Sequence, residues 1–184
     1  MTDEHALRVL YLHGLESGPR AGKVVTLREA GFEVHAPQLD ASAATALVYA
    51  GNTDALAYSR ALDVPLAQAA EAAARVAPEV IVGSSFGAAV LLRLLHEHPV
   101  EGAAAVLLAG AGLKMTPYAT LPRAPRVVLV HGRGDLVIPF EDSRTLAASS
   151  PRAVMVEVDD DHRLTETTRS GLLRELVRLA HRLR

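Results

Sequence analysis

The sequence contains no cysteine, and this single absence removes several kinds of chemistry. Without a thiol the chain can form no disulfide bond, hold no zinc ion through thiolates and supply no cysteine nucleophile. The absence also fits a reducing compartment, where proteins do not depend on disulfides. Any catalytic chemistry must therefore come from other side chains.

Long hydrophobic runs and blocks of basic residues are also missing. The first five residues, MTDEH, are acidic, and the apolar run at 7–12 is too short for a signal peptide or a membrane span. Lys and Arg are spread along the chain, and the net charge is −2. We therefore expect a cytoplasmic protein with no membrane span and no nucleic-acid partner.

Apolar residues are abundant enough to build a substantial core. The chain has 184 residues, of which 49% are hydrophobic, so a disordered chain is excluded. The sequence contains neither an internal repeat nor a linker-like segment. We expect one domain that covers residues 1–184, and nothing in the sequence indicates its oligomeric state.

Short strand-like runs alternate with helical patterns along the chain. The expected strands cover 7–12, 32–36, 80–82, 103–109, 126–130 and 153–158. The expected helices cover 19–30, 65–77, 88–98, 141–149 and 165–183. This order predicts an α/β fold with a mostly parallel six-stranded sheet and helices on both faces. Residues 113–125 should form a loop, and 40–63 either a mobile loop or short helices near the site mouth.

The stretch at 79–95, EVIVGSSFGAAVLLRLL, changes from strand to helix around a G-x-S-x-G motif. Ser85 has Gly83 and Gly87 two residues before and after it, whereas Ser84 lacks this spacing. Glycines there leave room for a sharp turn that exposes the Ser85 hydroxyl over the carboxyl edge of the sheet, at a helix N-terminus. Ser85 is therefore the candidate nucleophile.

Polar residues follow the ends of three expected strands in the order serine, acid, histidine. Ser85 follows the third strand, Asp135 the fifth and His162 the sixth, which is the chain order of α/β-hydrolase triads. Asp142 is a rival acid, but its position indicates the first turn of the next helix. The acidic run at 159–161 is expected to form a solvated turn.

These residue types suit acyl transfer. Because a serine hydroxyl is a weak nucleophile, His162 Nε2 would take its proton, and Asp135 would orient and stabilise the His162 ring. The oxyanion should bind the backbone N–H groups of Phe86, which directly follows Ser85, and of Leu15, which follows a His-Gly pair.

Two other histidines and a glycine-containing segment are interpreted as structural rather than catalytic. His13 and His131 each precede a glycine at a strand end, so we expect them to hydrogen-bond loop backbone. The segment at 18–23 resembles a phosphate loop, but its glycine spacing is one residue short. Val24 also stands where such loops have the Ser or Thr that holds Mg²⁺, so we expect no nucleotide site.

Four motifs together resemble those of small bacterial α/β-hydrolases: YLHGLESGPRAGK, IVGSSFGAAV, HGRGDLVIP and DDDHRL. The first is similar to that of the YqiA-type esterases, which begin with YLHG-x-x-S-x-P-x-x-x-K and carry G-S-S-x-G. The resemblance implies an α/β-hydrolase fold and a carboxylesterase or thioesterase that acts on short to medium acyl groups without a cofactor. Ser85, Asp135 and His162 fall on the triad positions.

The expected site is open. The segment between Gly110 and Pro125 is too short for the helical cap that larger members insert there, so we expect no cap domain. The candidate residues of the acyl-pocket wall are Leu39, Leu113, Met115, Tyr118, Val137 and Ile138.

The sequence thus predicts a serine hydrolase that cleaves small carboxylic esters or thioesters through an acyl-enzyme on Ser85. Lyases and cofactor-free perhydrolases use the same triad on the same fold and are one alternative. A non-catalytic ligand sensor is another, although a pure binding protein has no evident use for Asp135 and His162 behind Ser85.

Overall fold

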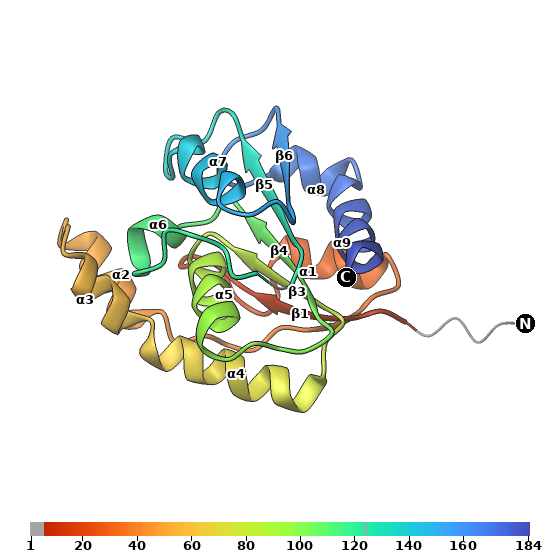
Figure 1. Cartoon of the computed structure of the whole chain (residues 1–184), viewed down its shortest axis with the longest axis horizontal. Coiled ribbons are helices and arrows are strands. Elements are labelled where there is room, and N and C mark those ends of the chain that lie inside the picture. The colour runs from red at the N-terminus through yellow and green to blue at the C-terminus, as the bar shows by residue number, and fades with distance from the viewer. Residues whose placement is uncertain (1–5, 124) are drawn as a thin grey trace, which may run out of the picture.

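The computed structural model describes residues 6–123 and 125–184, so the acidic run MTDEH lies outside the described residues. Within these ranges the chain forms one six-stranded sheet in the order β2-β1-β3-β4-β5-β6 (Figure 1). Every neighbouring pair is parallel, which confirms the predicted α/β class. The strands are β1 (Arg8–Leu12), β2 (Glu33–His35), β3 (Val80–Ser84), β4 (Ala104–Leu108), β5 (Val127–Gly132) and β6 (Ala153–Val158).

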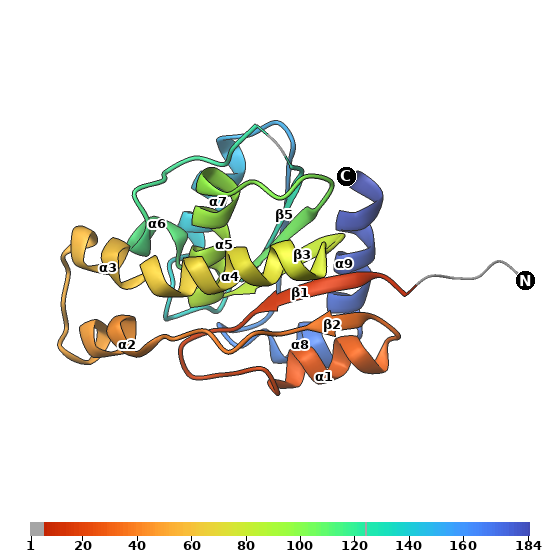
Figure 2. The same cartoon turned by 90° about the horizontal axis from the view of Figure 1, so that it is seen from below.

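Helices cover both faces of the sheet, as parallel strands require. Helices α4, α5 and α7 pack on one face, and α1 and α9 pack on the other (Figure 2). None of the helices in the described ranges is both long and apolar enough to cross a membrane. The helices are α1 (Gly22–Glu29), α2 (Ser42–Tyr49), α3 (Ala55–Ala61), α4 (Asp63–Val76), α5 (Phe86–Glu97), α6 (Gly112–Met115), α7 (Phe140–Ala148), α8 (Thr165–Arg169) and α9 (Leu172–Leu183).

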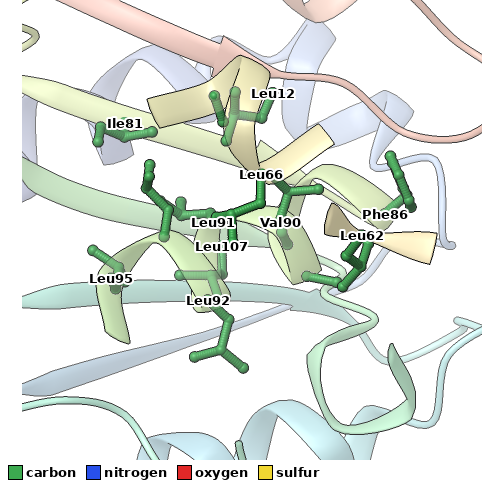
Figure 3. Close-up of a cluster of buried hydrophobic side chains, with 14 of the residues drawn as sticks. Leu12, Leu62, Leu66, Ile81, Phe86, Val90, Leu91, Leu92, Leu95 and Leu107 are labelled. Atoms are coloured by element: carbon green, nitrogen blue, oxygen red, sulfur yellow. The ribbon is translucent and has the colours of Figure 1, made fainter. Parts of the chain in front are cut away.

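The sheet separates two apolar clusters because successive strand residues point to opposite faces. Toward α4 and α5, the strand residues Leu12, Ile81 and Leu107 pack with Leu66 and Leu91 (Figure 3). Helix α5 is buried along its first ten residues, which explains why it lacks a polar face. The helix that begins at the candidate nucleophile is therefore the most deeply buried helix in this cluster.

Some helix boundaries differ from the prediction. Helix α1 begins at Gly22 rather than Pro19, and Val25 on this helix is 42% exposed. The predicted closing helix is two helices, α8 and α9, because Gly171 between them adopts a φ of 83°. Glycine tolerates this left-handed conformation, which ends a regular helix.

The segment at 40–63 contains short helices, α2 and α3, so that alternative is the right one. Both helices lie beyond the carboxyl ends of the strands (Figure 2). The expected loop at 113–125 is partly helical, since α6 forms one turn there. Because the described chain between β4 and β5 holds only this four-residue helix, there is no room for a cap domain at that point.

A buried arginine on α5, Arg93, links this helix to the α3–α4 junction by hydrogen bonds. The Arg93 guanidinium donates to both carboxylate oxygens of Glu97 at 2.8 and 2.9 Å, to Asp63 Oδ1 at 2.9 Å and to the Ser59 carbonyl at 2.8 Å. A buried charge is tolerated only when it is paired and hydrogen-bonded in this way. The end of α3 and the start of α4 are thus held against α5.

The N-terminus of α5 lies against β1 at Gly87. A Cβ atom on Gly87 would lie only 2.0 Å from the Leu12 carbonyl oxygen. The Leu12 carbonyl is a backbone group, and the position of the Cβ is fixed by the backbone of Gly87, so no side-chain rearrangement can relieve the clash. The absence of a side chain at Gly87 is what lets α5 begin this close to the sheet.

We therefore predict that Gly87→Ala lowers the free energy of unfolding by about 2 kcal/mol or more, measured by urea denaturation. Gly22→Ala is the matched control, because a Cβ there meets nothing within 4 Å. The control should unfold at the wild-type urea concentration or slightly above it. Equal stability of the two variants would contradict the close-packing argument.

Candidate active site

Ser85 occupies a strained turn between β3 and α5. Its φ of 54° and ψ of −112° are rare for a residue with a side chain. The surrounding backbone holds this conformation: the Ser85 N–H donates to the Leu108 carbonyl at 2.8 Å, and the Ser85 carbonyl accepts from Ala88 and Ala111 at 3.0 and 3.3 Å. The turn also needs Gly83, where a Cβ would lie 2.5 Å from the Gly87 carbonyl oxygen.

The structure brings Ser85, His162 and Asp135 into one hydrogen-bonded line. His162 Nε2 lies 3.0 Å from Ser85 Oγ, and His162 Nδ1 lies 2.8 Å from Asp135 Oδ2. Since an ionised carboxylate can only accept hydrogen bonds, Nδ1 must carry the proton. The lone pair of Nε2 is then free to accept the hydroxyl proton of Ser85.

Asp135 is ionised in this position. Its side chain is fully buried, and burial pushes its pKa upward. The N–H of Ile138, the His162 ring and the N–H of Val137 outweigh burial and hold the pKa of Asp135 below its ordinary value. The two backbone N–H groups bind the other oxygen, Oδ1, at 2.8 Å for Val137 and 2.9 Å for Ile138. The rival acid, Asp142, lies in the first turn of α7, as expected.

The loop that carries His162 is fixed from two sides. Asp160 accepts hydrogen bonds from the Thr167 N–H at 2.8 Å and the Thr167 hydroxyl at 2.9 Å, so it is more than the solvated turn residue that was expected. From α1, Lys23 Nζ donates to the Arg163 carbonyl. Lys23, the last residue of the first sequence motif, thus contacts the backbone next to His162.

The loop after β1 presents a backbone N–H near the nucleophile. A Cβ on Gly14 would lie 3.5 Å from Ser85 Cβ, so this loop and the strained turn are in contact. His13 Nε2 accepts from the Leu39 N–H at 3.0 Å, so Nδ1 carries the proton and donates to the Gly14 carbonyl at 2.9 Å. The expectation that His13 bonds loop backbone is therefore confirmed.

This bond also sets the direction of the next N–H. In a trans peptide the carbonyl and the following N–H point in opposite directions, so anchoring the Gly14 carbonyl orients the Leu15 N–H. Phe86 is the first residue of α5, and its N–H has no partner within the helix. Both N–H groups named for the oxyanion thus belong to backbone beside Ser85.

A cavity of about 420 Å³ adjoins Leu15. Its wall mixes apolar and polar groups, including Leu39, Gln38, Asp40 and Gln68. Leu39 is therefore the one expected pocket residue that lines this cavity.

The other expected pocket residues are placed differently. Tyr118 stacks on His96 with ring centroids 3.9 Å apart and donates to Glu97 at 3.1 Å. These contacts place Tyr118 at the end of α5 opposite Ser85, and it does not line the cavity beside Leu15. Met115 and Ile138 are buried in the α5-side cluster, and Leu113 packs against it.

Val137 is the exception among these residues, because its side chain is 64% exposed in the loop that carries Asp135. An exposed apolar side chain at that position is open to contact with a bound molecule.

In residues 6–123 and 125–184, no group of three or more acidic or histidine side chains is arranged to hold a metal ion.

Comparisons with known proteins identify the fold. No protein-family model matches the sequence, and no curated protein sequence matches it either. Among solved structures, a candidate hydrolase of the alpha/beta superfamily from Xanthomonas campestris pv. campestris is 26% identical. Its TM-score is 0.62, and the match covers 94% of this chain and 96% of that one.

Two esterases are similar in structure at lower identity. The Pyrococcus furiosus esterase PF2001 is 14% identical with a TM-score of 0.66, over 95% of this chain and 82% of that one. The esterase domain of a Rhodothermus marinus protein is 15% identical with a TM-score of 0.64, over 98% and 89%. The chain therefore has the α/β-hydrolase fold.

The bonds of Asp160 predict a pH-dependent contribution to stability. Burial raises the pKa of Asp160, but its bonds to Thr167 and Asp161 outweigh burial and lower the pKa overall. A lowered pKa in the folded state means that the contribution is complete at neutral pH and is lost as the pH falls. We expect Asp160→Asn to cost about 1 kcal/mol at pH 7 and progressively less below about pH 4.

Urea denaturation of both proteins between pH 7 and pH 3 measures this difference. Asp159→Asn is the control, because Asp159 is an exposed neighbour in the same acidic run. A difference between wild type and Asp160→Asn that stays constant with pH would contradict the assignment.

Proposed function

We propose that this protein is a serine hydrolase that cleaves carboxylic esters or thioesters of short to medium acyl groups. The observation that carries the proposal is the line from Ser85 Oγ through His162 to Asp135, with distances of 3.0 and 2.8 Å. Ser85 stands on a strained turn, and such strain is concentrated at functional sites. The esterases among the structures of similar fold support the same reaction class.

In the first half of the reaction, Ser85 Oγ attacks the acyl carbonyl carbon while His162 Nε2 takes the hydroxyl proton. Asp135 stabilises the imidazolium that forms. The N–H groups of Leu15 and Phe86 bind the negative oxygen of the tetrahedral intermediate. The intermediate collapses when His162 returns the proton to the leaving alcohol or thiol, which leaves an acyl group on Ser85.

In the second half, water takes the place of the departed alcohol or thiol. His162 Nε2 removes a proton from this water as its oxygen attacks the acyl carbon. The second tetrahedral intermediate releases the carboxylic acid, and the proton passes back to Ser85 Oγ. The cycle needs no group beyond these side chains, two backbone N–H groups and water.

The cavity beside Leu15 favours short substrates. A long alkyl chain would have to pass Gln38, Asp40 and Gln68, whose amides and carboxylate lose hydration when covered by an apolar chain. On this proposal, acetyl to butyryl groups are accepted better than longer chains, because they cover less of these polar groups. A small-molecule ester or thioester is therefore the substrate class that fits best.

The first sequence motif supports a YqiA-type esterase as the finer assignment. Three of its polar residues bind backbone near the proposed catalytic groups: His13 and Ser17 bind the Gly14 carbonyl, and Lys23 binds the Arg163 carbonyl. The motif thus has a physical use in a hydrolase of this type, because it connects the oxyanion loop and the His162 loop.

We expect a fluorophosphonate probe to label wild-type protein at Ser85, as mass spectrometry of the labelled peptide would show. Ser85→Ala should abolish labelling, and His162→Ala should slow it by about 10³-fold, because the hydroxyl then lacks its base. Ser84→Ala is the matched control and should still be labelled.

A folded wild-type protein that resists the probe and hydrolyses no ester would overturn the proposal in favour of a binding protein. Labelling without ester or thioester turnover would instead point to a lyase or perhydrolase. A panel of such substrates makes this distinction.

We also expect preference for short acyl chains among p-nitrophenyl esters. The value of kcat/KM should fall by about tenfold or more from butyrate to decanoate, since the polar groups in the wall of the cavity beside Leu15 do not reward additional methylene groups. A kcat/KM that rises with chain length would show that the cavity beside Leu15 does not receive the acyl group.

A further inference from the structure

Asp135 has a second histidine neighbour that the reaction described above does not use. His131 Nε2 lies 3.0 Å from Asp135 Oδ2, and both side chains are completely buried. This is the same oxygen that accepts the His162 Nδ1 proton at 2.8 Å. One carboxylate oxygen therefore lies between two imidazole rings.

The surroundings of His131 fix which nitrogen carries its proton. Nε2 hydrogen-bonds the Ile138 carbonyl oxygen at 3.2 Å, and Asp135 Oδ2 lies 3.0 Å from the same nitrogen; both of these groups can only accept. Nδ1 lies 2.7 Å from the Ser143 hydroxyl, which can donate to it. Nε2 therefore carries the proton, and the positive end of this N–H bond lies beside the Asp135 carboxylate while it donates to Ile138.

We propose that His131 acts through Asp135 to limit the strength of His162 as a base. The Nε2–H dipole offsets part of the negative charge on Oδ2, so the carboxylate stabilises the His162 imidazolium less than it otherwise would. The effect is large because the pair is buried, where charges are weakly screened. The inference rests on the proposed function, in which His162 is the base.

Removal of the His131 side chain should change how strongly Asp135 stabilises the His162 imidazolium, without moving the Asp135 carboxylate. Asp135 Oδ1 keeps its bonds to the N–H groups of Val137 and Ile138 at 2.8 and 2.9 Å, so the carboxylate stays in place. Oδ2 then interacts with His162 alone. The imidazolium gains stabilisation, and His162 becomes the stronger base.

Other charged groups near the two rings must be separated from this effect. Helix α7 brings the Asp142 carboxylate into the electrostatic field of His131, and the Phe140 ring meets the imidazole edge-on. On the His162 side, Asp160 and Asp161 precede the ring in its own loop, and Lys23 reaches the Arg163 carbonyl from α1.

The test is a titration of the His162 imidazole by ¹⁵N–¹H NMR on the full chain, which requires no turnover. In His131→Leu the midpoint of His162 protonation should rise by about half a unit to one unit. His131→Gln, whose amide N–H can replace Nε2–H, should bring the midpoint back toward that of wild type. The acid limb of the kcat/KM profile should move in the same directions.

Two control variants address the remaining explanations. Leu129→Val removes a methylene from a fully buried residue two positions earlier in β5, so it tests for general loosening of the same strand. Asp142→Asn removes the nearby carboxylate of α7. Neither variant should reproduce the rise seen in His131→Leu. If His131→Leu does not fold, His131→Met offers a side chain of similar volume.

An unchanged or lowered His162 midpoint in a folded His131→Leu or His131→Met protein would overturn the inference. So would a wild-type His131 ring that carries its proton on Nδ1 alone. Because the titration is read without substrate, absence of hydrolysis and of Ser85 labelling rejects the proposed function separately. If the protein hydrolyses nothing but the His162 midpoint still rises in His131→Leu, the result would support the effect of His131 on His162 through Asp135.

Discussion

The close approach of α5 to the sheet determines most of the site. Backbone meets backbone where Gly87 lies against the Leu12 carbonyl and where Gly83 lies against the start of α5. The chain can turn from β3 into α5 this tightly only because Ser85 accepts a positive φ. Once that turn is fixed, the loop after β1 lies within contact distance of Ser85, and the loops after β5 and β6 complete the arrangement at the same sheet edge.

The fold and the three central residues could be predicted from sequence because each depends on local, repeated rules. Buried parallel strands are continuous apolar runs, and their carboxyl ends share one edge. The rest depends on tertiary contacts that leave no such pattern. Tyr118 is apolar enough for a pocket but stacks on His96 instead, and the helical pattern after Thr165 continues through the break at Gly171.

The residues that support the site were harder to predict from the sequence, because they bind backbone groups. Lys23 acts on a carbonyl oxygen, and Asp160 acts partly on a backbone N–H. A bond to backbone places no demand on the identity of the partner residue, so no complementary pair appears in the sequence. His131 was correctly expected to bind loop backbone, at the Ile138 carbonyl, but its contact with Asp135 depends on the path of the intervening loop.

The tip of the loop that carries Asp135 can accept amino-acid substitutions. Leu136 is 98% exposed and Val137 64% exposed, yet they directly follow the buried acid. The loop holds Asp135 through the peptide N–H groups of Val137 and Ile138, and any residue other than proline supplies such a group. Side chains at 136 and 137 can therefore be exchanged without disturbing the carboxylate. Random libraries restricted to these two positions, with proline left out, would vary the exposed surface next to Asp135 and leave the carboxylate in place.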